Sequence, residues 1–131
     1  MSEINEMCYI CSPYRGDEET VKRNKEYARE LTRTAIDNGF LPVTVHLYIT
    51  EVMDDTDADE RALGLTVGLE ILNSCKYILI GGRYGITQGM SREIARAIDT
   101  GKVILTTGGK DDREVSVNLN VAELDRYVRS L

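Results

Sequence analysis

The sequence predicts an α/β fold in which a parallel sheet is covered by helices on both faces. Strand-like and helix-like segments alternate along the chain, and the strand-like segments are continuously apolar rather than alternating. Continuously apolar strands are typical of parallel sheets, because these are buried on both faces. With 131 residues, 42% of them hydrophobic, the chain can form one domain with a substantial core. We therefore expect one domain over residues 1–131, a three-layer sandwich of the flavodoxin or Rossmann kind with four or five parallel strands.

The first elements follow from apolar runs and helical periodicity. Residues 8–11 are an apolar run that stops at a Ser-Pro pair, which predicts a buried strand. Over residues 17–38, apolar and small side chains recur at steps of three and four, which predicts a helix that ends at the following glycine. Residues 41–45 predict a second strand, weakened by a proline.

The same signals predict the later elements. An acidic residue followed three positions later by glutamate introduces one helix, and glycines follow the next strand and the next helix. The predicted elements are a helix over 57–74, a strand over 77–80, a helix over 87–100, a strand over 103–105 and a helix over 121–130. Residues 107–120 show no clear period, and we expect a loop there.

Composition and charge exclude several classes of protein. The net charge of −6 argues against binding to a nucleic-acid backbone, which requires a clustered basic face. No run approaches the roughly eighteen apolar residues of a membrane span, and the N-terminus lacks the layout of a signal peptide. Three cysteines without an export signal indicate free thiols in a reducing compartment. We therefore expect a cytoplasmic protein that contacts neither nucleic acid nor membrane.

The residues give no indication of a metal or a redox cofactor. His46 is the only histidine and cannot found a zinc site by itself. The acidic run over residues 54–60 lacks the glycine and glutamate positions of a calcium-binding loop. Cys8 and Cys11 lie within one strand and point to opposite faces, unlike a redox pair or a zinc knuckle. We expect no cofactor and no bound metal.

Ligands of such folds bind beyond the carboxyl ends of the strands, so the loops at residues 12–16, 44–48 and 81–89 are the candidate site. The first loop offers a hydroxyl, an aromatic ring, a guanidinium and a close backbone approach, from Ser12, Tyr14, Arg15 and Gly16. The glycine patterns of dinucleotide-binding and P-loop enzymes are absent. Arg15 suits a phosphate or a ribose hydroxyl, and equally a surface ion pair in a simple turn.

The glycine-rich loop that follows the strand at 77–80 is the second candidate. Its glycines, among them Gly82 and Gly89, allow a ligand to touch the backbone. On the helix behind it, Met90 belongs to the buried stripe and Glu93 falls at the edge of that stripe, facing the rim of the sheet. Burial there would raise the pKa of the carboxyl. On geometry alone, an ion pair with Arg92 or Arg96 is the favoured interpretation.

Two further polar residues lie near the same rim. Asn24 is on the inward stripe of the first helix, where a buried polar side chain needs a partner from the backbone or from a ligand. His46 follows the second strand, where it suits a general base or a hydrogen-bonded loop anchor, and we favour the anchor.

Two motifs in this order and spacing resemble a known family. They are CSPYRG at residues 11–16 and, after the glycine-rich loop, GMSREIA at residues 89–95. The chain resembles the nucleoside 2-deoxyribosyltransferase-like superfamily over most of residues 7–106, and within it the small uncharacterised branch found in phages and their bacterial hosts.

The resemblance implies a nucleoside or nucleotide ligand and a covalent mechanism. Glu93 matches the family's nucleophile, which attacks C1′ and gives a glycosyl-enzyme intermediate. The loop at residues 12–16 would contact the sugar and its 5′ substituent, with Arg15 and Gly16 favouring a 5′-phosphate, and Gly89 and Ser91 would line the sugar or phosphate pocket. Relatives of this fold pair as homodimers, so the resemblance also implies a homodimer or a higher homo-oligomer.

One departure from the family pattern opens a second hypothesis. The aspartate that helps to protonate the leaving base is matched here by Gly68, and Asp57 or Asp59 would reach the site only if their loop folds over it. Losing a general acid costs on the order of 10²–10⁴ in rate. The alternative is therefore a non-catalytic protein that sequesters or senses a nucleotide-derived signal, as some phage proteins do. A third hypothesis is an oligomeric protein whose pocket is a relic.

Overall fold

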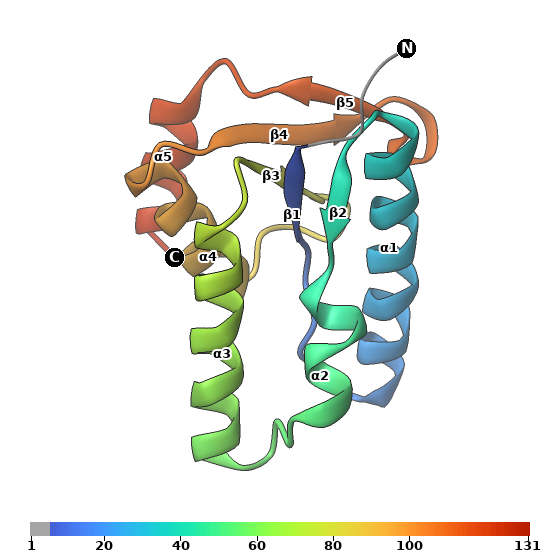
Figure 1. Ribbon diagram of the computed structural model, residues 1–131, viewed down its shortest axis with the longest axis vertical. Helices are drawn as coiled ribbons and strands as arrows, with labels where there is room; N and C mark the ends of the chain where they lie inside the picture. Colours follow the sequence, from blue (N-terminus) through green and yellow to red (C-terminus); the bar gives the residue numbers. More distant parts are fainter. Residues whose placement is uncertain (1–5) are drawn as a thin grey trace.

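The computed structural model describes residues 6–131 and contains one five-stranded sheet (Figure 1). In spatial order the strands are β2 (Leu41–Val43), β1 (Met7–Cys11), β3 (Tyr77–Ile80), β4 (Val103–Gly108) and β5 (Glu114–Val117). The first four strands along the chain are parallel, and β5 runs antiparallel to β4. The predicted α/β fold is confirmed, with one strand that departs from the parallel arrangement.

Helices cover both faces of the sheet (Figure 1). The helix α1 (Glu18–Asp37) packs on one face, and α3 (Ala58–Asn73), α4 (Gln88–Asp99) and α5 (Val121–Arg129) pack on the other. The core beneath α1 contains Cys8, Ile10, Tyr27, Leu31, Ala35, Leu79 and Leu105. The opposite core includes Tyr9, Cys11, Leu72, Ile78, Ile80, Met90, Ile94, Ala97, Ile104 and Val128. The thiols of Cys8 and Cys11 therefore lie on opposite faces, as the strand period predicts.

The predicted starts of the three long helices are confirmed by side-chain caps. Asp17 and Asp57 accept hydrogen bonds from backbone N–H groups in the first turns of α1 and α3. Thr87 accepts one at 3.2 Å from the first turn of α4. These bonds satisfy donors that a helix leaves without intrahelical partners. Within residues 6–131, no helix is both long and apolar enough to cross a membrane.

Residues 107–120 were expected to form a loop, and that expectation is wrong. β4 continues to Gly108, a short 3-10 turn follows at Lys110–Asp112, and β5 then pairs with β4 in the register Leu105↔Val117. β5 has only four residues, too few to show a clear alternation, and its hydrogen-bonding partners come from another strand. Its conformation therefore depends on pairing that a local pattern does not reveal.

The segment after β2 also differs from the prediction. The strand ends at Val43 rather than at residue 45, and a 3-10 helix (Val45–Leu47) and the short helix α2 (Ile49–Val52) follow it. These two turns carry the chain from the sheet to the start of α3 (Figure 1).

The order of the strands creates a crevice at the carboxyl edge of the sheet. β1 and β3 are neighbours, yet β1 continues into α1 on one face and β3 continues toward α4 on the other. Connections that diverge to opposite faces leave a gap beyond the strand ends, where ligands of such sheets bind. The fold therefore places the loop after β1, the turns after β2 and the start of α4 around one space.

Gly81, directly after β3, lies where α1 approaches the sheet closely. A Cβ atom at this position would lie 2.4 Å from Leu31 Cδ1 and 2.8 Å from the hydroxyl of Tyr27, both on α1. We expect Gly81→Ala to lower the free energy of unfolding by about 1–3 kcal/mol, because the added methyl group overpacks this contact. Urea denaturation measures the change.

The adjacent glycine supplies the control. A Cβ atom at Gly82 would meet no atom within 4 Å, so we expect Gly82→Ala to change the free energy of unfolding by less than about 0.5 kcal/mol. Equal destabilisation by the two substitutions would contradict the packing argument.

Candidate active site

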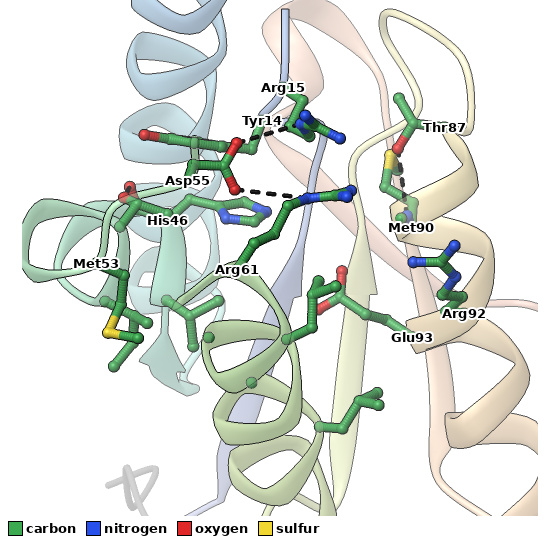
Figure 2. A pocket seen from close by; sticks show the side chains of 18 of the residues that line it. Tyr14, Arg15, His46, Met53, Asp55, Arg61, Thr87, Met90, Arg92 and Glu93 are labelled. Atoms are coloured by element: carbon green, nitrogen blue, oxygen red, sulfur yellow. Dashed lines mark hydrogen bonds and ion pairs between the residues drawn. The ribbon is translucent and has the colours of Figure 1, made fainter. Parts of the chain in front are cut away.

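A cavity of about 310 Å³ occupies the crevice at the carboxyl edge of the sheet (Figure 2). Its wall combines residues from β1 and the following loop, the turns after β2, the loop before α3, α3 itself as far as Leu69, and the start of α4. The residues predicted for the site that line it are Ser12, Tyr14, Arg15, His46, Gly89, Met90 and Glu93. The apolar part of the wall includes Val45, Ile49, Met53, Leu65 and Leu69. A largely apolar cavity of this size with a few converging polar groups is typical of small-molecule sites.

Glu93, in the second turn of α4, presents its carboxylate to the floor of this cavity (Figure 2). The thiol of Cys11 donates a weak hydrogen bond to Oε1 at 3.9 Å. Burial raises the pKa of Glu93 to about 7, and hydrogen bonding by Tyr9 and Cys11 offsets part of that rise. A carboxyl with this pKa exchanges its proton near neutral pH, which suits acid–base or nucleophilic work.

The alternative of a surface ion pair for Glu93 does not hold within residues 6–131. Arg92 also lines the cavity but makes no ion pair with Glu93 there. Arg96 instead donates to the side chain of Asn73 at 3.4 Å. The glutamate therefore faces the cavity without a cationic partner.

Tyr9, which the sequence did not single out, lies in the floor of the cavity beside Gly68, which matches the position of the family's aspartate. Tyr9 is 1% exposed, and a Cβ atom at Gly68 on α3 would lie 3.4 Å from its hydroxyl. Burial and the neighbouring Glu93 raise the pKa of Tyr9, so its hydroxyl stays protonated and can donate. Tyr9 lies inside an apolar run, where an aromatic residue is normally interpreted as part of the core. The sequence signal for a role in the site was its polar hydroxyl group, on a strand that leads into a rim loop.

His46 anchors the loop after β1, as predicted. Its Nε2–H donates to the backbone oxygen of Ser12 at 3.0 Å, and its ring stacks on Tyr14 with centroids 5.1 Å apart. Because burial lowers the pKa of His46, the imidazole is neutral at pH 7 and Nδ1 is an acceptor. Within residues 6–131, Nδ1 of His46 and Oγ of Ser12 are buried atoms without a hydrogen-bond partner. Buried polar atoms normally have partners, so this wall is prepared for a polar ligand.

The charged part of the wall holds three arginines and three carboxylic acids. Arg15, Arg61 and Arg92 line the cavity together with Asp55 and Glu93 (Figure 2), and Glu60 completes the charged lining. Asp55 lies between the first two arginines, 3.2 Å from Nε of Arg15 and 3.6 Å from Nε of Arg61. The ion pair that the sequence suggests for Arg15 is present, and the side chain also faces the cavity, while its role toward a phosphate or a ribose hydroxyl stays a prediction. The contributions of Arg61 and Asp55 depend on the fold and have no local sequence signal.

Four other predicted residues lie outside the cavity wall. Asn24 finds its partner in the backbone, because Nδ2 donates to the oxygen of Tyr14 at 3.0 Å. The hydroxyl of Ser91 donates to the oxygen of Gln88 at 2.6 Å. A Cβ atom at Gly16 would lie 2.5 Å from Cγ2 of Thr20, so this glycine permits the entry into α1. The fourth, Gly82, is exposed.

The remaining acids predicted near the site are engaged elsewhere. Asp57 caps α3, and neither it nor Asp59 lines the cavity. The part of the chain that the structure describes holds no group of three histidine, cysteine, aspartate or glutamate side chains able to bind a metal ion.

The raised pKa of Glu93 predicts a pH-dependent effect of Glu93→Gln on stability. The pKa is about 7 in the folded protein against an ordinary value of 4.5, so the folded state loses stability as the pH rises through this interval. Glutamine cannot ionise. We therefore expect the free energy of unfolding of Glu93→Gln, relative to that of the natural protein, to increase by on the order of 1–3 kcal/mol between about pH 5 and about pH 8. Urea denaturation at both pH values measures the difference.

Glu70→Gln is the control, because Glu70 is exposed on α3. Its effect on the free energy of unfolding should be the same at both pH values. A pH-independent effect of Glu93→Gln would contradict the assignment of a raised pKa.

Comparison with solved structures supports the description of the fold. A structure of a 2-deoxyribosyltransferase from the psychrotolerant bacterium Bacillus psychrosaccharolyticus is similar to this chain, with a TM-score of 0.60 and 17% sequence identity. The similarity covers 89% of this chain and 80% of the other. At this level of identity the similarity establishes a shared fold.

Sequence comparison gives a family without an activity. No curated protein matches the sequence. A family described as a domain of unknown function matches residues 6–107, which include every residue in the cavity wall. Because this match spans most of the chain, the protein belongs to the domain-of-unknown-function family DUF7768.

Proposed function

We propose that this protein cleaves or exchanges the N-glycosidic bond of a nucleoside or nucleoside monophosphate, with Glu93 as the nucleophile. The observation that carries the proposal is the carboxylate of Glu93, which faces a cavity of about 310 Å³ at the carboxyl edge of the sheet. The similarity of the fold to a 2-deoxyribosyltransferase supports the same reaction class. Fold similarity alone does not define a reaction, so the proposal depends on the chemistry of the cavity.

The reaction would proceed in two displacements. A carboxylate oxygen of Glu93 bonds to C1′ while the bond from C1′ to the base breaks and its electron pair passes to the base nitrogen. An acceptor base or a water molecule then attacks C1′ from the vacated side and releases the carboxylate. Only the ionised carboxylate is nucleophilic, and with a pKa of about 7 a part of the Glu93 population carries it at neutral pH. Cys11 and Tyr9 contact the carboxylate and would restrain its orientation.

The remaining wall suits a sugar and a base. Oγ of Ser12 and Nδ1 of His46 are buried without partners among the described residues 6–131, and they would pair with ligand hydroxyl or amino groups. The apolar side chains of the wall would contact the flat face of a base. Arg15 at the mouth would contact a 5′-phosphate.

One observation favours a second candidate function, which is binding without turnover. Gly68 stands where the family resemblance places an acid, and it lines the cavity beside the hydroxyl of Tyr9. The other acids in the wall are Asp55, which faces two arginines, and Glu60. Without protonation of the leaving base, the protein would retain a nucleotide-derived ligand instead of cleaving it.

The nucleophile assignment predicts the loss of base release in Glu93→Gln, because an amide cannot form the glycosyl ester. The natural protein and the variant are incubated with a panel of nucleosides and nucleoside monophosphates, and chromatography follows free base while filtration follows retained ligand. For the natural protein, single-turnover base release should rise about tenfold per pH unit below pH 7 and level off above it, as the carboxylate ionises.

Glu70→Gln, on the exposed side of α3, should release base at the natural rate. Base release that persists in Glu93→Gln would exclude this mechanism. Retention of intact ligand by the natural protein, with no release from any substrate, would establish the binding function instead.

The missing acid predicts a gain of function. In Gly68→Asp a carboxyl group would enter the cavity beside Tyr9, and we expect base release to increase by up to about 10²-fold, because the leaving base would gain a proton donor. Gly64→Asp is the matched control: Gly64 lines the same cavity one turn earlier, and its Cβ would lie 3.8 Å from Met53. Chromatography of free base compares the variants, and an equal increase in both would show that position 68 has no special role.

A further inference from the structure

A carboxylate of the protein itself lies between two arginines at the mouth of the cavity (Figure 2). Arg15 comes from the loop after β1, Asp55 from the loop between α2 and α3, and Arg61 from the start of α3. The two oxygens of Asp55 face different guanidinium groups, at 3.2 Å and 3.6 Å from the respective Nε atoms. All three side chains line the cavity.

The contacts of Asp55 are of the weak kind that a ligand can replace. The side chains of Arg15, Asp55 and Arg61 are 59%, 45% and 34% exposed. Exposed ion pairs contribute little to stability, since water and salt screen them. Each arginine meets Asp55 through Nε, and within residues 6–131 neither guanidinium makes another ion pair. Their terminal nitrogens therefore remain available as donors to an oxyanion.

The loop that carries Asp55 is held independently of this contact. The side chain of Asp54 accepts hydrogen bonds from Thr56, at 3.0 Å from its backbone N–H and 2.6 Å from its hydroxyl. Asp57 donates its backbone N–H to the oxygen of Asp54 at 3.1 Å and caps α3. Asp55 can therefore leave the arginines by rotating its side chain, while the backbone on both sides keeps its hydrogen bonds.

The two arginines at the mouth share a single carboxylate. Arg15 and Arg61 both pair with Asp55, so displacement of that one side chain would leave two cationic groups facing the cavity. A phosphate group has more acceptor oxygens and more negative charge than a single carboxylate, so it can accept from both guanidinium groups at once. A neutral sugar has no group that would compete with Asp55.

We propose that Arg15 and Arg61 form a two-arginine subsite for the phosphate of a sugar phosphate ligand, and that Asp55 occupies this subsite until the ligand displaces it. The inference deepens the proposed function, on which it rests for the identity of the cavity as the ligand site. It assigns the ligand class as phosphorylated rather than free nucleosides, with Arg61 as a specificity-determining residue. Asp55 acts as an internal competitor that lowers the affinity for phosphate.

Binding of base-free probes tests the proposal. The dissociation constants of deoxyribose 5-phosphate, deoxyribose and inorganic phosphate are measured by isothermal titration calorimetry on the full chain. Asp55→Asn should lower the dissociation constant of deoxyribose 5-phosphate about threefold to tenfold and leave that of deoxyribose unchanged, because the competitor has lost its charge. Arg61→Gln should raise the dissociation constant of deoxyribose 5-phosphate by at least a similar factor without affecting that of deoxyribose. Inorganic phosphate should follow the direction of the sugar phosphate but bind more weakly.

Asp59→Asn controls for net charge, because Asp59 is an exposed acid near Asp55 that does not line the cavity. The proposal is overturned if Asp59→Asn and Asp55→Asn bind deoxyribose 5-phosphate equally more tightly than the natural protein. It is also overturned if Asp55→Asn binds phosphate more weakly than the natural protein, or if neither of these two proteins binds the sugar phosphate measurably. Equal tightness of inorganic phosphate and sugar phosphate would reduce the site to a free-phosphate site and overturn the ligand class.

These outcomes are separate from those of the proposed reaction. If Asp55→Asn and Arg61→Gln change the affinity for deoxyribose 5-phosphate as expected but no substrate releases base, the phosphate subsite is supported and the glycosidic reaction is not. If base is released equally from nucleosides and nucleoside monophosphates and the Asp55 and Arg61 effects are absent, the reaction stands and the subsite does not.

Discussion

The parallel pairing of β1 with β3 determines where every part of the candidate site lies. The register runs from Cys8↔Tyr77 to Cys11↔Ile80, and the backbone N–H of Gly81 continues it by donating to the oxygen of Cys11 at 2.9 Å. The segments after the two strands then separate: β1 continues into α1, and β3 continues toward α4 on the opposite face. A crevice results beyond the ends of the two strands, and Tyr9 of β1 contributes to its floor. The helix that follows β3 brings Glu93 back to β1.

The alternation of side chains along β1 supplies the floor of that crevice. Tyr9 and Cys11 point toward α3 and α4, while Cys8 and Ile10 point toward α1. The carboxylate of Glu93 therefore meets a phenol and a thiol, and both are weak acids that donate without carrying charge. Burial raises the pKa of Glu93 by more than these two donors lower it, so the glutamate keeps a proton at a pH where an exposed carboxyl would be ionised.

Local patterns predicted the elements that carry their own signals. Apolar runs and caps such as Asp57 and Thr87 located the strands and the long helices, and the rim loops located Glu93 and the anchoring role of His46. β5 was missed because its conformation depends on pairing with β4. Arg61 and Asp55 were missed because their relation to Arg15 exists only after the loop that follows β1 meets the start of α3. The sequence thus predicts which edge of the sheet carries the site, while the charged mouth of the cavity is a product of tertiary packing.

Because the cysteines are buried, the rate at which each thiol is labelled reports how often the structure around it opens. Cys8, Cys11 and Cys75 are all 1% exposed or less, and burial raises the pKa of each thiol, that of Cys8 to about 12. A thiol-specific reagent therefore reacts only in molecules that have opened. Cys11 becomes accessible when the floor beneath Glu93 separates, whereas Cys8 requires α1 to leave the other face. The ratio of the labelling rates of Cys11 and Cys8 thus distinguishes opening of the cavity from detachment of α1, with no engineered cysteine.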